Sequence, residues 1–258
     1  MARQEKKALF ARETYGRQTL RPLNCLIFVL PLLVFFHVGA GLYAGEDSVR
    51  LLAHEDIGVV LRYFGATIAY LPAMLLIVVL LVQHAARRDR FKFQPRVLAG
   101  MSGESILWML PLLALAYMTG RLWTQVGFAA QAVAVEPAGA EAGNRVMPGL
   151  IGAAGAGIYE EFIFRMILIS LVLLLFADVF GLRRDVVTVA AVIVSAILFS
   201  LYHFTAEQLS TMDSFPWYEF VFRAVAGVYL GVVFVFRGFG IAVGVHAIYN
   251  FYVMLSRL

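Results

Sequence analysis

The sequence has little charge and almost no cysteine. Only 15% of its 258 residues are charged and 61% are hydrophobic, whereas a soluble domain has about 25% charged residues. So little polar surface excludes a water-facing globule, and so much apolar content excludes a disordered chain. The single cysteine, Cys25, excludes a disulfide-rich secreted scaffold. A mean hydropathy of +0.81 instead indicates a polytopic membrane protein, in which short charged loops interrupt long apolar runs.

Several catalytic and binding signatures are also missing. The sequence contains no phosphate-binding loop, no dinucleotide fingerprint, no HExxH zinc motif and no serine in a rhomboid-like GxSx setting. The net charge of +4 is small, and no basic patch suggests nucleic acid as a partner. We find no internal repeat and no appended soluble domain. The glycines at GxxxG spacing, Gly227 and Gly231, are interpreted as a helix-packing surface.

Seven stretches are apolar and long enough to cross the membrane, since about 20 residues span the hydrocarbon core. The sequence therefore predicts an all-α, polytopic transmembrane helix bundle with about seven spans, within a range of six to eight. The apolar segment Met147–Gly157 is too short to cross and is interpreted as an interfacial or re-entrant lead-in to the fourth span. The predicted spans are 24–43, 63–83, 104–120, 158–179, 186–204, 217–236 and 238–255.

The loop charges predict the orientation, because basic residues favour the cytoplasmic side. The expected organisation is a basic cytoplasmic arm over 1–22 and a single membrane domain over 23–258, with the C-terminus outside. No cleavable signal peptide is evident, and the short loops suggest a bacterial plasma membrane. The inner loops carry Arg87, Arg88, Arg90, Lys92, Arg96, Arg183, Arg184 and Arg237, and the outer ones carry Glu46, Asp47, Glu55, Asp56, Glu136, Glu141, Glu207 and Asp213.

Ionisable and amide side chains gather within the apolar second half of the chain. A charge at membrane depth is costly, so each needs a partner, a water-filled cavity or a function. Any one of them alone could be a polar contact between helices, but the whole set points to a functional site. The set comprises Glu160, Glu161, Arg165, His203, Arg223, His246 and Asn250.

Helical spacing separates the two adjacent acids. Glu161 and Arg165 are four residues apart, so they share a helix face and are expected to form an ion pair. Glu160 points about 100° away from Glu161 and is left without that partner. The spacing therefore suggests that Glu161 is structural and that Glu160 is free for proton chemistry.

The two histidines are expected to approach Glu160 to different degrees. A hairpin between the fourth and fifth spans returns His203 to the depth of Glu160, close to the outer face. His246 and Asn250 are four residues apart on one face of the last span. His246 lies only about 14 Å from the inner turn, which leaves it deeper than Glu160 by about 10 Å. An inset turn at the glycine-rich residues 237–240, or a strong tilt, would close the gap, and the sequence does not decide this.

The ordered set of motifs resembles the CPBP family, the group of type II CAAX prenyl endopeptidases and Abi-like intramembrane proteases. The resemblance lies in EExxxR at Glu160–Arg165, FxxxH at Phe199–His203 and HxxxN at His246–Asn250. It covers the half of the chain over about 147–255. The first three spans are similar only in being apolar.

The resemblance implies a role for each matching residue. Glu160 would activate the attacking water, and His203 would hold or polarise it. His246 and Asn250 would stabilise the oxyanion of the tetrahedral intermediate. The same resemblance gives Glu161 and Arg165 a supporting role in the site.

The resemblance leaves the question of a metal open. Catalysis by a glutamate without metal is favoured, so no cofactor is expected. If a Zn²⁺ ion takes part, its ligands would be Glu160, His203 and His246, because zinc binds carboxylates and imidazoles.

We therefore expect an intramembrane endopeptidase whose substrate is a membrane-anchored protein or peptide. An outward-facing site would suit a secreted peptide better than a CAAX substrate. The alternatives are a proton-coupled transporter, with the same residues as an ion relay, and a non-catalytic scaffold with the same fold. The lipid bilayer is the other expected partner. The sequence gives no oligomeric state.

Overall fold

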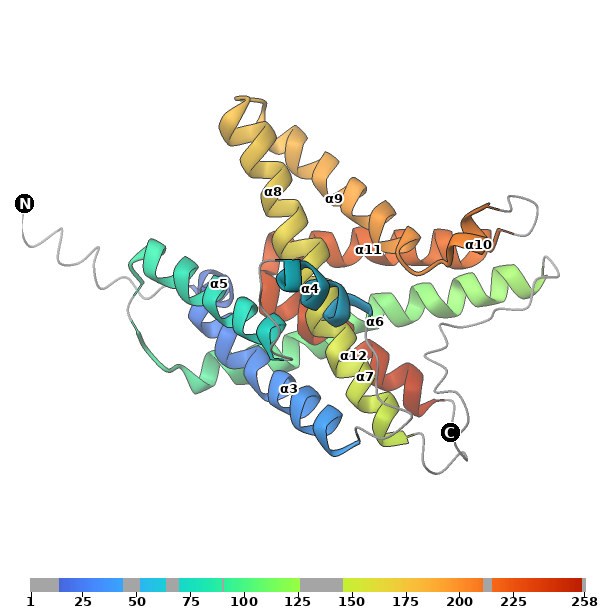
Figure 1. Cartoon of the computed structure of the whole chain (residues 1–258), viewed down its shortest axis with the longest axis horizontal. Helices are drawn as coiled ribbons and strands as arrows, with labels where there is room; N and C mark the ends of the chain where they lie inside the picture. Colours follow the sequence, from blue (N-terminus) through green and yellow to red (C-terminus); the bar gives the residue numbers. More distant parts are fainter. Residues whose placement is uncertain are drawn as a thin grey trace, which may run out of the picture.

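The computed structural model describes residues 14–43, 52–63, 70–89, 91–125, 146–210 and 215–256, and all regular structure within them is helical. Figure 1 shows the helices crossing one another in a bundle. In chain order they are α2 (Tyr15–Thr19), α3 (Pro22–Leu42), α4 (Leu52–Tyr63), α5 (Leu71–Arg87), α6 (Pro95–Gln125), α7 (Val146–Glu161), η2 (Phe162–Ile169), α8 (Ser170–Val172), η3 (Leu173–Val179), α9 (Arg184–Leu201), α10 (Ala206–Ser210), α11 (Trp217–Arg237) and α12 (Phe239–Leu255).

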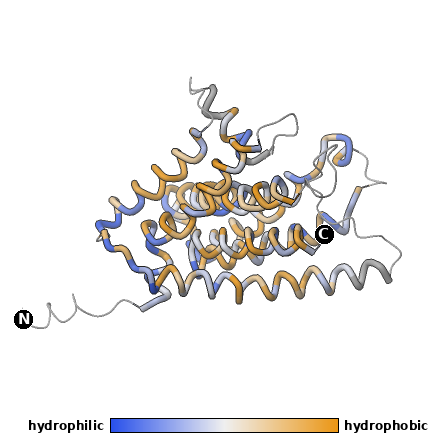
Figure 2. The backbone as a smooth tube through the Cα atoms, turned by 90° about the horizontal axis from the view of Figure 1, so that it is seen from below, coloured by the Kyte–Doolittle hydropathy of each residue, from blue (hydrophilic) through white to orange (hydrophobic). Residues whose placement is uncertain are grey.

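Seven apolar helical stretches within the described ranges confirm the predicted all-α membrane bundle. Five are long and apolar enough to span a bilayer, namely α3, most of α6, the unbroken run from α7 to η3, α9 and α11. Two shorter apolar helices, α5 and α12, complete the set. In Figure 2 the apolar backbone segments lie side by side, with polar segments toward their ends. The chain is an integral membrane protein.

Several helix bounds differ from the predicted spans. The second apolar helix, α5, begins at Leu71 rather than at 63, and 64–69 lie outside the described residues. The third, α6, runs over Pro95–Gln125, well beyond 104–120. Before α5 lies the short helix α4, which the sequence did not predict. Its composition is mixed, with His54, Glu55 and Asp56 among apolar residues, and this hid it from a search for long apolar runs.

The interpretation of Met147–Gly157 as an interfacial or re-entrant segment is wrong. These residues form the first part of α7, and the helical run continues without a break from Val146 to Val179. Glycine weakens a helix in water, but a membrane requires every backbone group to be bonded within its own segment. Here the small residues also allow close packing, because α12 lies against them.

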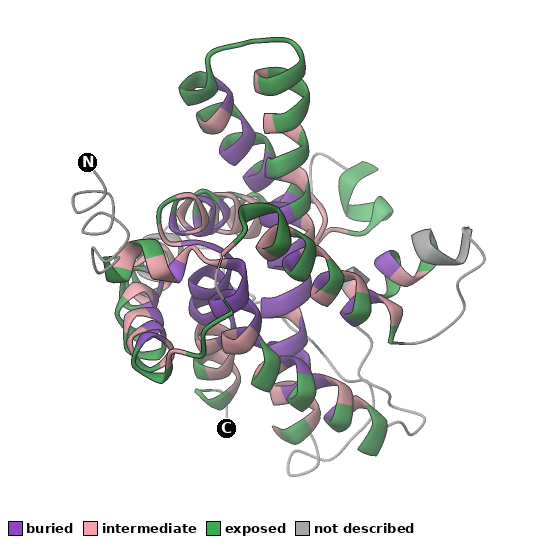
Figure 3. Cartoon of the chain, turned by 90° about the vertical axis from the view of Figure 1, so that its left-hand side faces the viewer, coloured by how far each residue is buried: buried purple, intermediate pink, exposed green. Residues whose placement is uncertain are grey.

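The helices α7 and α12 form the centre of the bundle. Nearly all of Ile151–Glu161 is buried, and so is every residue over Phe239–Ala247. Figure 3 shows this buried centre, with exposed residues on the protruding hairpin of η3 and α9. The exposed residues of that hairpin are largely Leu, Ile, Val and Phe, which is the surface that lipid requires. The predicted Gly227–Gly231 packing surface is confirmed, since both glycines lie against α9 at Ala196 and Val192.

Gly157 should be intolerant of even one added methyl group. A Cβ atom there would lie 2.8 Å from the backbone nitrogen of Ala247 on α12, and backbone cannot move aside as a side chain can. We expect Gly157→Ala to lower the free energy of unfolding by about 1–3 kcal/mol. Gly103→Ala on α6 is the matched control, because no atom lies within 4 Å of its added Cβ. Thermal unfolding in detergent measures both, and an equal midpoint for the two variants would rule out the close α7–α12 contact.

Predicted cytoplasmic segments meet at one end of the bundle. Arg87 at the end of α5 donates a hydrogen bond to the Leu20 carbonyl at 3.0 Å. Arg237 at the end of α11 forms an ion pair with Glu104, which also accepts a hydrogen bond from Tyr15 at 2.7 Å. The described end of the N-terminal arm therefore packs beside the α5–α6 connection and the α11–α12 turn.

Candidate active site

The two acids lie where α7 changes into a π-helix. Glu160 and Glu161 are the last residues of α7, and Arg165 lies in η2, which follows directly. A π-helix pairs each N–H with the carbonyl five residues earlier, and such turns are rare and frequently lie at functional sites. This change in helix type was not predicted from the sequence.

Glu161, Arg165 and His246 form a buried charged group. The Arg165 guanidinium lies 3.1 Å from Glu161 Oε1, and both side chains have no exposed surface. The same carboxylate oxygen accepts a hydrogen bond from Nδ1 of His246 at 2.7 Å. Arg165 also lies 4.3 Å from the centre of the Phe199 ring. The predicted i,i+4 ion pair is therefore confirmed, and it holds a histidine of the site as well.

Glu160 lies between the two histidines. Its Oε2 atom is 3.8 Å from Nε2 of His203 and 3.7 Å from Nε2 of His246. The Glu160 side chain keeps 11% of its surface exposed, so the site is enclosed but not sealed. The contact with His203 was predicted. The sequence left the contact with His246 open, with a gap of about 10 Å in the simplest arrangement. The two side chains meet, and α7 begins 12 residues earlier than the predicted span.

Hydrogen bonds fix which ring nitrogen of each histidine faces Glu160. Nδ1 of His203 lies 2.7 Å from the Phe199 carbonyl, and a carbonyl can only accept, so this nitrogen carries a proton. Nδ1 of His246 likewise donates to Glu161. Both Nε2 atoms are left to face the same Glu160 oxygen, at separations too long for a direct hydrogen bond. The spacing suits a water molecule bound among the three groups.

His203 lies in the turn after α9, two residues past the helix end. Burial lowers the pKa of His203, and the Glu160 carboxylate opposes this shift. A histidine whose pKa is lowered in the folded state stabilises the fold fully only above its unfolded value of about 6.5. We expect the wild-type melting temperature in detergent to fall as the pH drops below that value.

The control for this pH dependence is His203→Gln, which cannot titrate. Its melting temperature should fall less over the same pH range. Equal slopes for the wild type and the variant would show that His203 contributes nothing to the acid sensitivity.

Asn250 and Arg223 lie at the margin of the site. Asn250 is half-buried, one turn after His246 on α12, and its role at an oxyanion stays a prediction. Arg223 on α11 lies 5.1 Å from the centre of the Phe204 ring and interacts electrostatically with Glu160 and Glu219. A second positive charge thus reaches the surroundings of Glu160, although the sequence assigned Arg223 no role.

The three residues named as possible zinc ligands lie together, but they are not arranged as a metal site. Two imidazoles and one carboxylate are a donor set that zinc accepts. Within the described part of the chain, however, no three His, Cys, Asp or Glu side chains are placed to hold one ion. We therefore derive no step through a metal.

Sequence reasoning missed two contacts from the first half of the chain. The hydroxyl of Tyr159, next to Glu160, forms a hydrogen bond with His37 of α3 at 2.7 Å. The hydroxyl of Tyr202, next to His203, donates to Asp56 of α4. The one available signal was His37 itself, an ionisable residue inside an apolar span.

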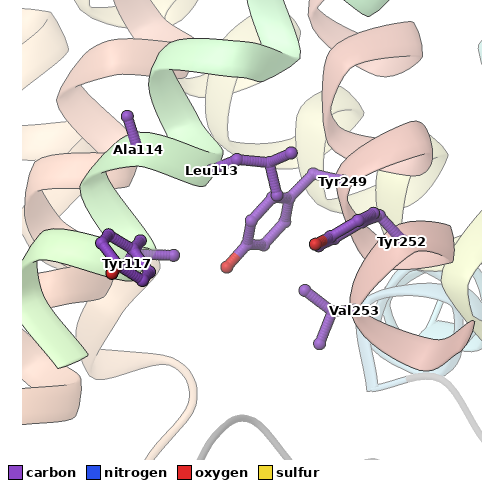
Figure 4. A pocket seen from close by; sticks show the side chains of 7 residues that line it. Leu113, Ala114, Tyr117, Tyr249, Tyr252 and Val253 are labelled. Atoms are coloured by element: carbon purple, nitrogen blue, oxygen red, sulfur yellow. The ribbon is translucent and has the colours of Figure 1, made fainter. Parts of the chain in front are cut away.

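A separate apolar cavity of about 460 Å³ lies between α6 and α12 (Figure 4). None of the six predicted site residues lines it. Its lining consists of Leu113, Ala114, Ala116, Tyr117, Tyr249, Tyr252 and Val253.

Comparison with known proteins identifies the half of the chain that carries the site. Residues 142–252 match the family model of the Rce1-like type II CAAX prenyl endopeptidases. This segment belongs to the CPBP family of intramembrane proteases. The CPBP segment contains the acidic pair, Arg165, both histidines and Asn250. No curated protein and no solved structure matches the chain. The match to this family implies a protease, which is a hydrolase.

Proposed function

We propose that the protein is an intramembrane endopeptidase in which Glu160 activates a water molecule. One observation carries this proposal: Nε2 of His203 and Nε2 of His246 converge on a single oxygen of Glu160, at 3.8 and 3.7 Å. A carboxylate oxygen and two imidazole nitrogens that face one another can all form hydrogen bonds to one water molecule. A water held there is positioned for attack on a peptide carbonyl.

The proposed reaction has two steps and no covalent enzyme intermediate. Glu160 takes a proton from the water as its oxygen bonds to the carbonyl carbon. The carbonyl oxygen becomes an oxyanion, for which His246 and Asn250 are the proposed donors. The protonated Glu160 then gives its proton to the leaving nitrogen, and the carbon–nitrogen bond breaks. The products are a new carboxyl terminus and a free amine.

The buried Glu161–Arg165 pair supports this chemistry through His246. Because Nδ1 of His246 already donates to Glu161, Nε2 can donate to an oxyanion only in the doubly protonated imidazolium. The adjacent Glu161 carboxylate balances the charge of that imidazolium. Arg165 in turn keeps Glu161 in place, since both are fully buried.

The depth of the site bears on the substrate. Glu160 follows the start of α7 by 14 residues, about 21 Å along the axis, and His246 lies midway along α12. Glu160 is thus near the middle of the continuous helical run Val146–Val179, and we propose that the site lies at mid-membrane depth and not close to the outer face, where the loop charges had suggested it. A CAAX substrate is no longer disfavoured on that ground, and we propose a membrane-anchored peptide of this kind as the first probe.

The test is cleavage by the purified protein in liposomes. One quenched fluorescent peptide would carry a farnesylated C-terminal CaaX sequence, and a second would carry a transmembrane anchor. We expect the farnesylated peptide to be cleaved. Cleavage of the anchored peptide alone would support the protease assignment but would replace the proposed substrate class. Cleavage of neither peptide would overturn the proposal, and a proton flux across the same liposomes would then support the transporter alternative.

We further propose that the protein resides in a bacterial plasma membrane with its N-terminus in the cytoplasm. Support comes from the basic loops and from the packing of the N-terminal segment beside Arg87 and Arg237 at one end of the bundle. A Ser256→Cys substitution at the other end of the bundle, labelled in spheroplasts, tests this orientation. The proposal requires labelling by an impermeant maleimide added from outside.

A further inference from the structure

Two tyrosines next to site residues are held by the first half of the chain, which carries none of the family motifs. Tyr159 precedes Glu160, and Tyr202 precedes His203. The Tyr159 hydroxyl is 2.7 Å from Nε2 of His37 on α3. Tyr202 donates to the Asp56 carboxylate on α4. The end of α7, which carries Glu160, and the turn after α9, which carries His203, are thus both connected to helices outside the CPBP segment.

The contact at Tyr159 is enclosed by aromatic rings. Tyr159 has no exposed surface, and its ring centre lies 4.9 Å from that of His54 and 5.5 Å from that of Phe36. His54 belongs to α4, and Phe36 and His37 belong to α3. A buried hydroxyl needs a hydrogen-bond partner, and His37 supplies it. The orientation of the helix turn that carries Glu160 therefore depends on α3 and α4.

The contact at Tyr202 holds the turn that carries His203 against α4. His203 lies in the turn after α9, where its backbone N–H bonds to Ser200 and not to a carbonyl four residues back. The Tyr202 ring packs on Phe164 at 5.4 Å between centres, and its hydroxyl reaches Asp56. Burial and the Asp56 carboxylate raise the pKa of Tyr202 above its usual range, so the hydroxyl keeps the proton that it donates.

Small displacements at such a site have large consequences. A shift of about 1 Å in a catalytic group can reduce the rate by about 100-fold. Glu160 and His203 come from different helices, so their separation depends on how α7 and the end of α9 are held. Helix α4 contacts both, through His54 at Tyr159 and through Asp56 at Tyr202.

We propose that His37 and Asp56 are positioning residues that set the geometry of Glu160 and His203 through Tyr159 and Tyr202. The proposal rests on the proposed protease function. It gives the first half of the chain a part in the reaction, although that half does not touch the reacting atoms.

A double-mutant cycle tests the Asp56–Tyr202 contact. Asp56→Ala and Tyr202→Phe should each lower kcat on the farnesylated peptide by about tenfold, with KM within about twofold, because alignment and not binding is lost. The double variant should be no slower than either single variant, since both remove the same contact. Tyr43→Phe, which removes the hydroxyl of an exposed tyrosine at the end of α3, is the control and should match the wild type.

The same variants can be compared by the rate at which His203 is chemically modified, a measurement that does not depend on peptide cleavage. Diethyl pyrocarbonate modifies an imidazole nitrogen that carries a lone pair, and mass spectrometry follows His203 against His84 on α5 as internal reference. Asp56→Ala should raise the His203 modification rate by about threefold or more as the turn loosens, with His84 unchanged.

The outcomes separate this proposal from the proposed function. If the wild type cleaves neither peptide, the protease assignment fails, and the modification rate alone decides the positioning role. If the wild type cleaves but the variants keep its kcat, or if the two substitutions act additively, the positioning role fails and the protease stands. Parallel cycles with His37→Leu and Tyr159→Phe test the second contact in the same way.

Discussion

Glu160→Gln should lower kcat for peptide cleavage by about 10³-fold or more, which lies within the range that a general base contributes. Glutamine keeps the shape of glutamate and can accept a hydrogen bond, but it cannot take a proton from water. KM should change little, because the residue is proposed to act on the water and not to bind the peptide. Initial rates of the reconstituted protein measure both constants.

Glu207→Gln is the control for this substitution. Glu207 lies exposed on α10, so its loss of charge should leave kcat unchanged. A Glu160→Gln variant that retains a third or more of the wild-type rate would mean that another group activates the water. Melting temperatures of both variants must match the wild type for the comparison to hold.

Arg165→Met should destabilise the fold by about 3–5 kcal/mol, the cost of removing one partner of a buried ion pair. Glu161 would keep its charge with no exposed surface and only His246 beside it. Arg165 also donates a hydrogen bond to the Gly227 carbonyl, at 3.4 Å, so α11 would lose a contact as well. Unfolding in detergent measures the change, as the shift in the midpoint of denaturation.

Two further variants test whether the loss of stability comes from breaking a buried ion pair. Arg183→Met breaks a surface pair with Asp185 whose side chains are mostly exposed, and it should have little effect. The double variant Glu161→Gln/Arg165→Met should lose less stability than the two single changes added together. Strict additivity would show that Glu161 and Arg165 do not interact as a pair.

Local spacing predicted the parts of the site that lie on one helix. Glu161 and Arg165 are four residues apart, and this distance in sequence fixes their meeting in space. The hairpin that returns His203 to Glu160 was also predictable, because a membrane constrains the length and direction of each span.

The contact of Glu160 with His246 was not predictable in the same way. It depends on where α7 begins, and the glycine- and alanine-rich residues 147–157 resembled a lead-in more than a helix. Once these residues join α7, Glu160 moves toward mid-depth and meets His246.

The contacts of Tyr159 and Tyr202 could not be read from sequence. Each joins residues more than 100 positions apart, and neither His37 nor Asp56 belongs to a motif. Such contacts depend on the packing of α3 and α4 against α7, which periodicity does not reveal. The amphipathic α4 was missed for the related reason that it is too short and too polar for a span.

The most direct test of water activation by Glu160 is to measure the products of peptide cleavage by metal-depleted protein in ¹⁸O-labelled water. Wild type treated with chelator, and shown by elemental analysis to hold no zinc, is incubated with the farnesylated peptide. The account predicts two peptide products, with ¹⁸O in the new carboxyl terminus, and no products from Glu160→Gln. Activity that disappears on chelation and returns with Zn²⁺ would contradict it, as would equal cleavage by the wild type and Glu160→Gln.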